Sequence, residues 1–139
     1  MPKPDVLPSE MAQASWIVSE SDLASALSQG HRDTFPRVFA TARMVALMEL
    51  AAARALTALL EEGELSVGVL VHVTHTAATP PGVRVTAEAR YTGREGKFYC
   101  FDVSARDEGG EIGRGRHQRA IVQTRRLLEG AMKRTKTAT

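Results

Sequence analysis

The residues best suited to chemistry in this sequence are a glutamate and a histidine that fall on apolar faces. Glu49 lies at the border of an apolar helical stripe, and His75 continues by alternation the valine face of a strand. A carboxylate and an imidazole that converge on one seam between helix and sheet form a general acid/base pair, and the carboxylate is also a nucleophile. Two plainer interpretations stay open: Glu49 reaches solvent, and His75 is a hydrogen-bonded core residue.

Thr41 and Gly68 are the next candidates. Thr41 precedes Glu49 by two helical turns on the same side, so their Cα atoms lie about 12 Å apart at about 1.5 Å per residue. We therefore expect no direct contact, and a substrate or a histidine must lie between them if they cooperate. Otherwise Thr41 is a small buried residue or a first-turn hydroxyl that satisfies backbone groups. Gly68 interrupts a strand, which indicates a β-bulge or a close approach of a ligand to the backbone, and a freed N–H there would donate to a carbonyl oxygen, as in an oxyanion hole. Tight packing of the helix on the strand is the plainer alternative.

Metal and cofactor chemistry find no support in the motifs. His72 and His75 are three residues apart on a strand and face opposite sides, and the single cysteine, Cys100, excludes both a zinc framework and an intrachain disulfide. Gly113-Arg114-Gly115 lacks the third glycine of a dinucleotide-binding loop. We therefore expect no metal site and no cofactor.

Hydrophobic periodicity predicts the elements that must position these residues. A 3.6-residue period predicts a long helix over residues 36–62, about 40 Å at about 1.5 Å per residue, and a period of two predicts strands before and after it. In chain order we expect a loose lead-in over 1–10, a strand at 14–18, a short helix at 20–31, the long helix, strands at 67–77, 83–91, 97–106 and 111–123, and a basic helix at 125–134. This order predicts one α+β domain over residues 1–139, a long central helix packed on an antiparallel sheet of about five strands, and it is similar to the hotdog fold.

Charge is distributed unevenly along the 139 residues. The formal net charge is +2, but residues 1–112 carry −5 and residues 113–139 carry +7. A positive end on a negative body indicates an anionic partner (nucleic acid, a membrane surface or a phosphorylated small molecule) or a solvated tail. The N-terminus has no signal-peptide core and no apolar stretch is long enough to span a bilayer, so we expect a cytoplasmic protein without a membrane partner.

Three segments resemble the fluoroacetyl-CoA thioesterase family. They are residues 39–49 (FATARMVALME), 73–82 (VTHTAATPPG) and 111–120 (EIGRGRHQRA), within a likeness that runs from about residue 33 to 123. The block around His75 is the most specific of the three. The resemblance implies a hotdog-fold homodimer with two active sites at the subunit interface, no metal, and hydrolysis of an acyl-CoA thioester.

The resemblance also implies a role for each matching residue. Glu49 would attack the thioester or activate water, Thr41 would orient the reacting group, and His75 would transfer protons. Gly68 would present its backbone N–H to the carbonyl. Arg119 would lie beside the acyl group, and Phe35 would form part of a lid over it.

Some positions depart from the family pattern. Arg32 replaces a second lid phenylalanine, Ala42-Arg43 replaces a Gly-Phe pair, and Leu50 replaces a tryptophan. Arg43 would need an ionic partner or solvent. The sequence therefore favours a short-chain acyl-CoA thioesterase, with fluoroacetyl-CoA as one candidate substrate.

Two other functions remain as alternatives, an enoyl-CoA hydratase of the same fold and a non-catalytic dimer that binds acyl-CoA. A nucleic-acid partner is not expected, because aromatic residues make up only 5% of the chain and the strands show no basic-aromatic surface. The basic end then fits the phosphates of coenzyme A. Arg114, Arg116, Arg125 and Arg126 are the expected contacts, and Arg119 is assigned to the acyl pocket instead.

Overall fold

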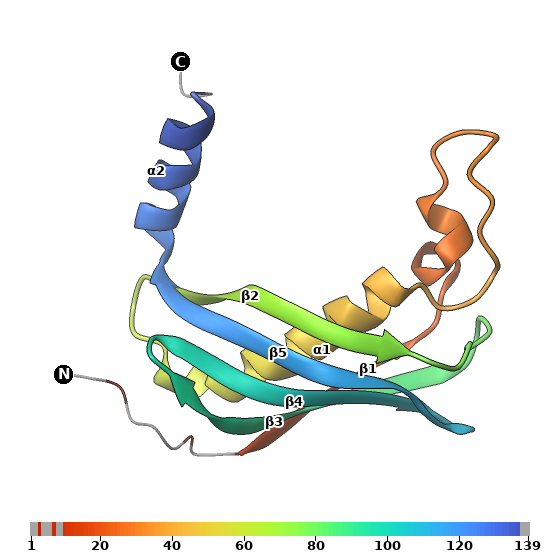
Figure 1. The fold of residues 1–139 in the computed structure, drawn as a ribbon, viewed down its shortest axis with the longest axis horizontal. Coiled ribbons are helices and arrows are strands. Elements are labelled where there is room, and N and C mark those ends of the chain that lie inside the picture. Colours follow the sequence, from red (N-terminus) through yellow and green to blue (C-terminus); the bar gives the residue numbers. More distant parts are fainter. Residues whose placement is uncertain (1–2, 4–6, 8–9, 137–139) are drawn as a thin grey trace.

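The computed structural model describes residues 3, 7 and 10–136. In chain order its elements are β1 (Met11–Ile17), α1 (Thr41–Leu56), β2 (Glu64–His75), β3 (Arg84–Glu95), β4 (Phe98–Asp107), β5 (Gly110–Gln123) and α2 (Thr124–Thr135), with short 3-10 helices at Glu20–Asp22, Ala24–Leu27 and Thr57–Leu59. One antiparallel sheet holds all five strands in the order β1-β3-β4-β5-β2. The predicted α+β architecture is confirmed (Figure 1).

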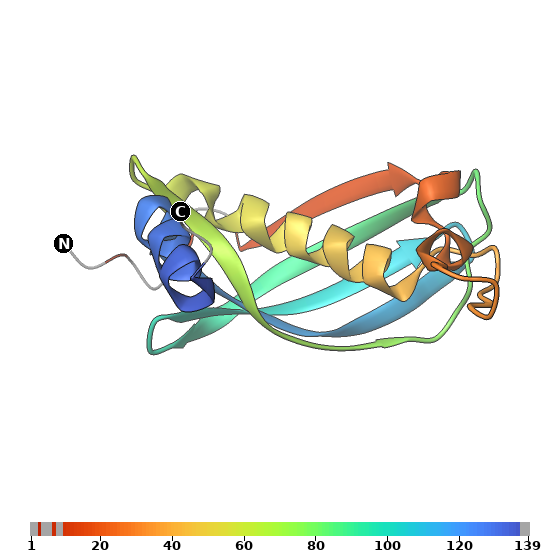
Figure 2. The same cartoon turned by 90° about the horizontal axis from the view of Figure 1, so that it is seen from above.

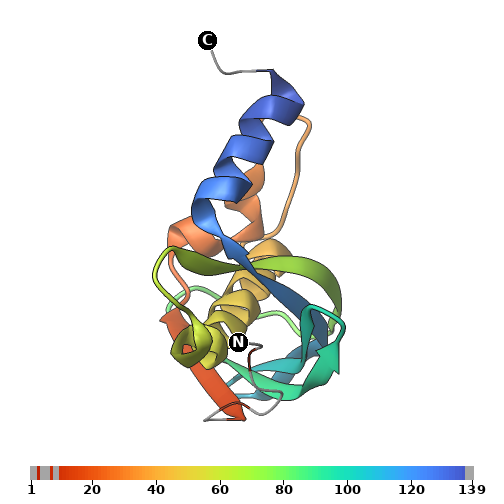
Figure 3. The same ribbon diagram turned by 90° about the vertical axis from the view of Figure 1, so that its left-hand side faces the viewer.

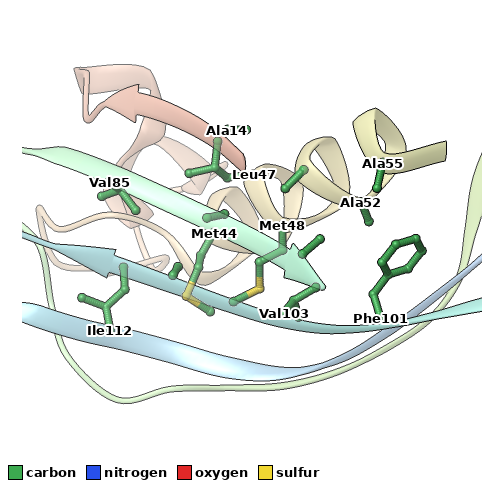
Figure 4. Packing of buried hydrophobic residues seen from close by; sticks show 14 of the residues in the cluster. Ala14, Met44, Leu47, Met48, Ala52, Ala55, Val85, Phe101, Val103 and Ile112 are labelled. Carbon is green, nitrogen blue, oxygen red and sulfur yellow. The ribbon is translucent and has the colours of Figure 1, made fainter. Parts of the chain in front are cut away.

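The sheet curls around α1, which lies along its inner face (Figures 2 and 3). The buried stripe of α1 consists of Met44, Leu47, Met48, Ala51, Ala52, Ala55 and Leu56, and it packs on side chains of β3, β4 and β5 such as Val85, Phe101 and Ile112 (Figure 4). The run of alanines at the end of this stripe lets the helix lie close to the sheet. The predicted helical stripe is therefore confirmed.

The long helix begins five residues later than predicted. Residues before Thr41 are extended because the Phe39 N–H donates to the Thr79 carbonyl at 2.8 Å and Phe39 forms a β-bridge with Leu23. α1 therefore has 16 residues, or about 24 Å at about 1.5 Å per residue, and a 3-10 turn follows it. The predicted start at 36 is wrong because these long-range contacts outweigh local helix signals.

The short helix predicted over residues 20–31 is also wrong in kind. Two separate 3-10 turns lie there, with Leu23 extended between them. Ser19 and Asp22 form a capping box at the first turn. Asp22 is buried and also accepts a hydrogen bond from Arg43 Nε at 2.9 Å. A buried carboxylate with a partner on α1 fixes this turn against the helix.

β2 is an edge strand, which changes the predicted burial of its valines. Its pairing with β5 shifts register between Gly68 and Leu70, so Val69 is an extra residue in a β-bulge. Val69 and Val71, predicted to face the helix, are each 45% exposed. The expected continuous apolar face of this strand therefore lies largely open in the single chain.

The predictions for the two ends of the chain have different outcomes. The predicted loose lead-in over 1–10 lies mostly outside the described residues, but Leu7 is buried and Lys3 donates to Glu64 Oε1 at 2.7 Å. The predicted basic helix is confirmed as α2, which projects away from the sheet (Figures 1 and 3). Neither α1 nor α2 is long and apolar enough to cross a bilayer, and the same holds for every helix among the described residues.

Candidate active site

Thr41 and His75 form a hydrogen-bonded pair. Thr41 opens α1 and His75 closes β2, and their Oγ1 and Nδ1 atoms are 2.7 Å apart. The other ring nitrogen of His75, Nε2, is buried and has no hydrogen-bond partner among the described residues. Burial lowers the pKa of His75, against a smaller opposing effect of the Ala77 carbonyl, so the imidazole is neutral at neutral pH. A neutral imidazole beside a hydroxyl is able to accept a proton.

This pair lies at the edge of an open pocket of about 390 Å³. The walls come from three places: the 3-10 turn at Ala24, the extended segment that includes Pro36 and Val38, and the residues that follow His75. Its volume lies within the range of about 300–1,000 Å³ that small-molecule pockets occupy. The predicted orientation of His75 toward the helix is confirmed by its bond to Thr41.

Glu49 belongs to a second polar group, with Arg119 of β5. Arg119 Nη1 donates to Glu49 Oε1 at 3.3 Å, and the arginine side chain is 8% exposed against 39% for the glutamate. Ser66 anchors the guanidinium, because its hydroxyl and carbonyl oxygens accept bonds from Nε at 2.9 Å and Nη2 at 3.0 Å. Burial lowers the pKa of Arg119, although Glu49 opposes this effect. Arg119 therefore holds the carboxylate of Glu49, which is on α1, next to β5.

Gly68 lies directly against this second group. A β-carbon at position 68 would overlap Glu49 Oε1 and would lie 3.2 Å from His117 Cε1. Only glycine allows the carboxylate to approach the strand so closely. A close approach of a side chain and a β-bulge therefore occur at the same place on β2.

His117 was not among the sequence-based candidates. It is buried between Glu49 and the bulge of β2, and it is hydrogen-bonded to Arg119 and to the Leu70 carbonyl. A signal was available: His117 and Arg119 are two residues apart on a strand, so their side chains share one face. His117 lies within the family-like segment 111–120.

One chain does not bring Thr41 and Glu49 together. The two groups lie eight residues apart on α1, about 12 Å along the axis at about 1.5 Å per residue, as the sequence predicts. Thr41–His75 sits at the start of the helix, and Glu49–Arg119 sits near its middle. Within a single chain the candidate catalytic residues therefore form two separate clusters.

The positions that depart from the family pattern have clear locations. Arg43 does not line the pocket; it pairs with Asp22 at 2.8 Å and stacks over Trp16 at 4.9 Å. Leu50 packs against the hydrophobic core. Phe35 is 48% exposed on the loop before α1, and it is not a wall of the pocket in the single chain. Its role as a lid stays a prediction.

Some of the C-terminal arginines bond to a glutamate, and others are exposed. Arg114 makes two 2.9 Å hydrogen bonds to Glu111, and Arg125 bonds to Glu129 at 3.1 Å. Arg116 and Arg126 are exposed. A contact between these arginines and coenzyme A phosphates stays a prediction.

Among residues 3, 7 and 10–136, no three His, Cys, Asp or Glu side chains are grouped closely enough to hold a metal ion. Gly113, part of the rejected glycine motif, has a packing role, because a β-carbon there would come within 2.7 Å of Met44 Sδ. The candidate site itself offers a carboxylate, an imidazole and a hydroxyl, supported by an arginine.

Comparison with known proteins gives consistent matches. A family model described as fluoroacetyl-CoA-specific thioesterase matches residues 18–125. A fluoroacetyl-CoA thioesterase from Streptantibioticus cattleyicolor is 52% identical over 88 residues, which are 63% of this chain and 63% of that protein, slightly less than two thirds of its length.

Solved structures agree with these sequence matches. A variant of a fluoroacetyl-CoA thioesterase in complex with fluoroacetate superposes with a TM-score of 0.82 at 40% identity, covering 93% of this chain and 97% of that one. A thioesterase superfamily member from Thermus thermophilus has a TM-score of 0.81 at 31% identity, covering 97% of this chain and 94% of that one. These likenesses confirm the predicted hotdog fold. The chain belongs to the fluoroacetyl-CoA-specific thioesterase family.

Proposed function

We propose that this protein hydrolyses short-chain acyl-CoA thioesters to the free acid and coenzyme A, with fluoroacetyl-CoA as a candidate substrate. The observation that carries the proposal is the 2.7 Å bond between Thr41 and His75 at the mouth of a pocket, in a chain of this family. A related structure with fluoroacetate and CoA bound has a TM-score of 0.78 and covers 85% of this chain. Its ligands are the two products expected from such a reaction.

Each candidate residue has a role in this reaction. Glu49 either activates water or attacks the thioester carbonyl to form an anhydride that water then cleaves. In both routes the carbon–sulfur bond breaks, water supplies the new acid oxygen, and the coenzyme A thiolate takes up a proton. His75 transfers protons, Thr41 orients the reacting group, and the backbone N–H of Gly68 points toward the carbonyl oxygen.

The active form is a homodimer formed through β2. Of the ten large hydrophobic side chains exposed in the described part of the chain, seven lie on β2 and α2: Leu65, Val69, Leu70, Val71, Leu127, Leu128 and Met132. An open strand edge with exposed apolar side chains is a template for pairing with another strand. A second copy paired antiparallel along β2 would cover this edge and continue the sheet across the two subunits.

Such a dimer would bring one cluster of each subunit next to the other cluster of its partner. A two-fold axis near Val45 of α1 and Val71 of β2 exchanges position 41 with 49 and position 68 with about 75. Both valines line the small hollow beside Glu49; Val45 is half-buried and Val71 is 45% exposed. Thr41 and His75 of one subunit would then face Glu49 and Gly68 of the partner subunit. The unpaired Nε2 of His75 would gain a carboxylate partner at that point.

The first experiment measures free thiol release from acetyl-, propionyl- and fluoroacetyl-CoA by the wild-type protein and by Glu49→Gln and His75→Ala. We expect turnover by the wild type and loss in both variants. Retention of near wild-type rates by both variants would overturn the mechanism. If the wild type releases no thiol but hydrates crotonyl-CoA, the result would favour the hydratase. If it only binds acyl-CoA, the result would favour the binding module.

A mixing experiment tests the shared site. When Glu49→Gln and His75→Ala subunits are unfolded, mixed in equal amounts and refolded together, half of the dimers are mixed, and each has one intact site if the site is shared. Activity should then rise to about one quarter of the wild-type value, as expected for random pairing in a two-fold dimer. If each subunit holds a complete site of its own, the mixture stays inactive.

A further inference from the structure

His117 is the most deeply buried ionisable side chain near the candidate site, with 1% of its surface exposed. Both of its ring nitrogens are hydrogen-bonded. Nδ1 lies 2.8 Å from the Leu70 carbonyl oxygen, and Nε2 lies 3.1 Å from Arg119 Nη1. No role described so far uses this residue.

These two partners determine where the imidazole proton resides. A carbonyl oxygen only accepts, so Nδ1 carries the hydrogen that is donated to Leu70. A guanidinium only donates, so Nε2 is a bare acceptor for Arg119. The geometry therefore requires neutral His117 with its proton on Nδ1, because an imidazolium would point a second N–H at the arginine.

The surroundings favour the same protonation state. Burial lowers the pKa of His117, and the charge of Arg119 lowers it further, while the Leu70 carbonyl and the Glu49 carboxylate act in the opposite direction. Glu49 on α1 and Arg119 on β5 are the charged groups that face the ring. The other side chains around this hollow, from β2 and β4, are apolar: Val71, Val73 and Val103.

The two hydrogen bonds join two parts of the site. Leu70 is where regular pairing resumes after the bulge that follows Gly68. Arg119 is the residue that holds the Glu49 carboxylate. His117 therefore connects the backbone beside Gly68 to the anchor of Glu49, across the narrow space in which a β-carbon at position 68 would collide with that carboxylate.

We propose that neutral His117 is a positioning residue for thioester hydrolysis: it orients Arg119 against Glu49 and fixes the bulge that carries Gly68. This inference rests on the proposed function. His117 acts through these neighbours and not on the substrate. Its removal should therefore lower kcat more than it changes KM, because a displacement of about 1 Å in a reacting group costs up to about 100-fold in rate.

Three substitutions separate the two bonds. His117→Gln can keep an acceptor for Arg119, His117→Asn can keep a donor for Leu70, and His117→Leu loses both. We expect His117→Leu to lower kcat about tenfold or more with KM changed less than twofold, and His117→Gln and His117→Asn to keep intermediate rates. A His117→Leu enzyme with wild-type kcat would overturn the proposal.

A double-mutant cycle distinguishes positioning from a general loss of packing. In a Glu49→Gln background, His117→Leu should reduce the residual rate by clearly less than it reduces the wild-type rate, because the carboxylate is already gone and only the effect on the bulge at Gly68 is left. Full additivity of the two losses would overturn the proposal. Thermal unfolding of each variant identifies any that fails to fold, and His117→Gln then serves in place of His117→Leu.

A spectroscopic measurement does not depend on turnover. Nitrogen NMR of the wild-type protein labelled with ¹⁵N-histidine should show one neutral imidazole with its proton on Nδ1, and this signal should change in Arg119→Gln. A proton on Nε2 or an imidazolium at pH 7 would overturn the proposal even in an active enzyme. If the protein hydrolyses no thioester but shows this signal, the proposed function fails while the hydrogen-bond geometry stands.

Discussion

The two polar clusters along α1 differ in how completely their hydrogen bonds are satisfied. Thr41–His75 is a single bond at an open pocket, and one buried nitrogen of the histidine is unpaired. In the cluster of Glu49, Arg119 and His117, each buried nitrogen has a partner. A buried polar atom without a partner is costly, so the first cluster is suited to receive a group and the second to hold one in place.

The largest expected effect comes from breaking the pair of Thr41 and His75. His75→Ala removes the proton carrier and should lower kcat at least 100-fold, within the range of about 10²–10⁴ for general acid–base catalysis. Release of free thiol from acetyl-CoA measures this loss. His72→Ala is the matched control, because His72 is exposed on the same strand. Equal losses in the two variants would show that the effect is not specific to the pair with Thr41.

A smaller effect should follow from adding a methyl group beside the cluster of Glu49, Arg119 and His117. Gly68→Ala places a methyl group where Glu49 Oε1 lies, so the carboxylate must move. We expect kcat to fall by about 10- to 100-fold, since a misplacement of about 1 Å is enough for such a loss.

Gly30→Ala is the control for this substitution, because a β-carbon at position 30 meets no atom within 4 Å. Its rate should match the wild type. A Gly68→Ala enzyme as active as the Gly30→Ala control would mean that the close approach at position 68 has no part in catalysis.

The lid substitution should have a modest effect on the open pocket. Arg32→Phe restores the second lid phenylalanine of the family beside Phe35. Because one additional apolar contact is worth about 1–3 kcal/mol, we expect about a tenfold rise in the ratio of kcat/KM for fluoroacetyl-CoA over acetyl-CoA. An unchanged ratio would remove Arg32 from the specificity of the site.

The smallest effect concerns stability as a function of pH. Burial holds the folded-state pKa of His117 below its ordinary value of 6.5, so the unfolded chain binds this proton first as pH falls. The free energy of unfolding that His117 contributes is fully present above pH 6.5 and declines below it. Thermal unfolding should show a lower Tm at pH 5.5 than at pH 7.5.

His117→Gln removes this titration, so the difference in Tm between pH 7.5 and 5.5 should be smaller than in the wild type. His72→Gln, at an exposed position, should leave it unchanged. An identical pH dependence in the wild type and His117→Gln would mean that His117 is not buried in its neutral form.

Local patterns were sufficient for most of the elements but not for their ends. The alternation that predicts strands at 83–91, 97–106 and 111–123 matches β3, β4 and β5 within a few residues at each end. The start of α1 was misplaced because Phe39 bonds to Thr79, a contact that no local pattern contains. The exposure of Val69 and Val71 likewise depends on the place of β2 at the sheet edge.

The sequence by itself determined the chemical inventory, the helical spacing of Thr41 and Glu49, and the family. Only the tertiary structure decided which distant groups meet: His75 with Thr41, Arg43 with Asp22, and His117 with the Leu70 carbonyl after the bulge at Gly68. The physical reason is that periodicity depends on neighbours within a few residues. A hydrogen bond between residues 34 to 47 positions apart depends instead on how the sheet curls around the helix.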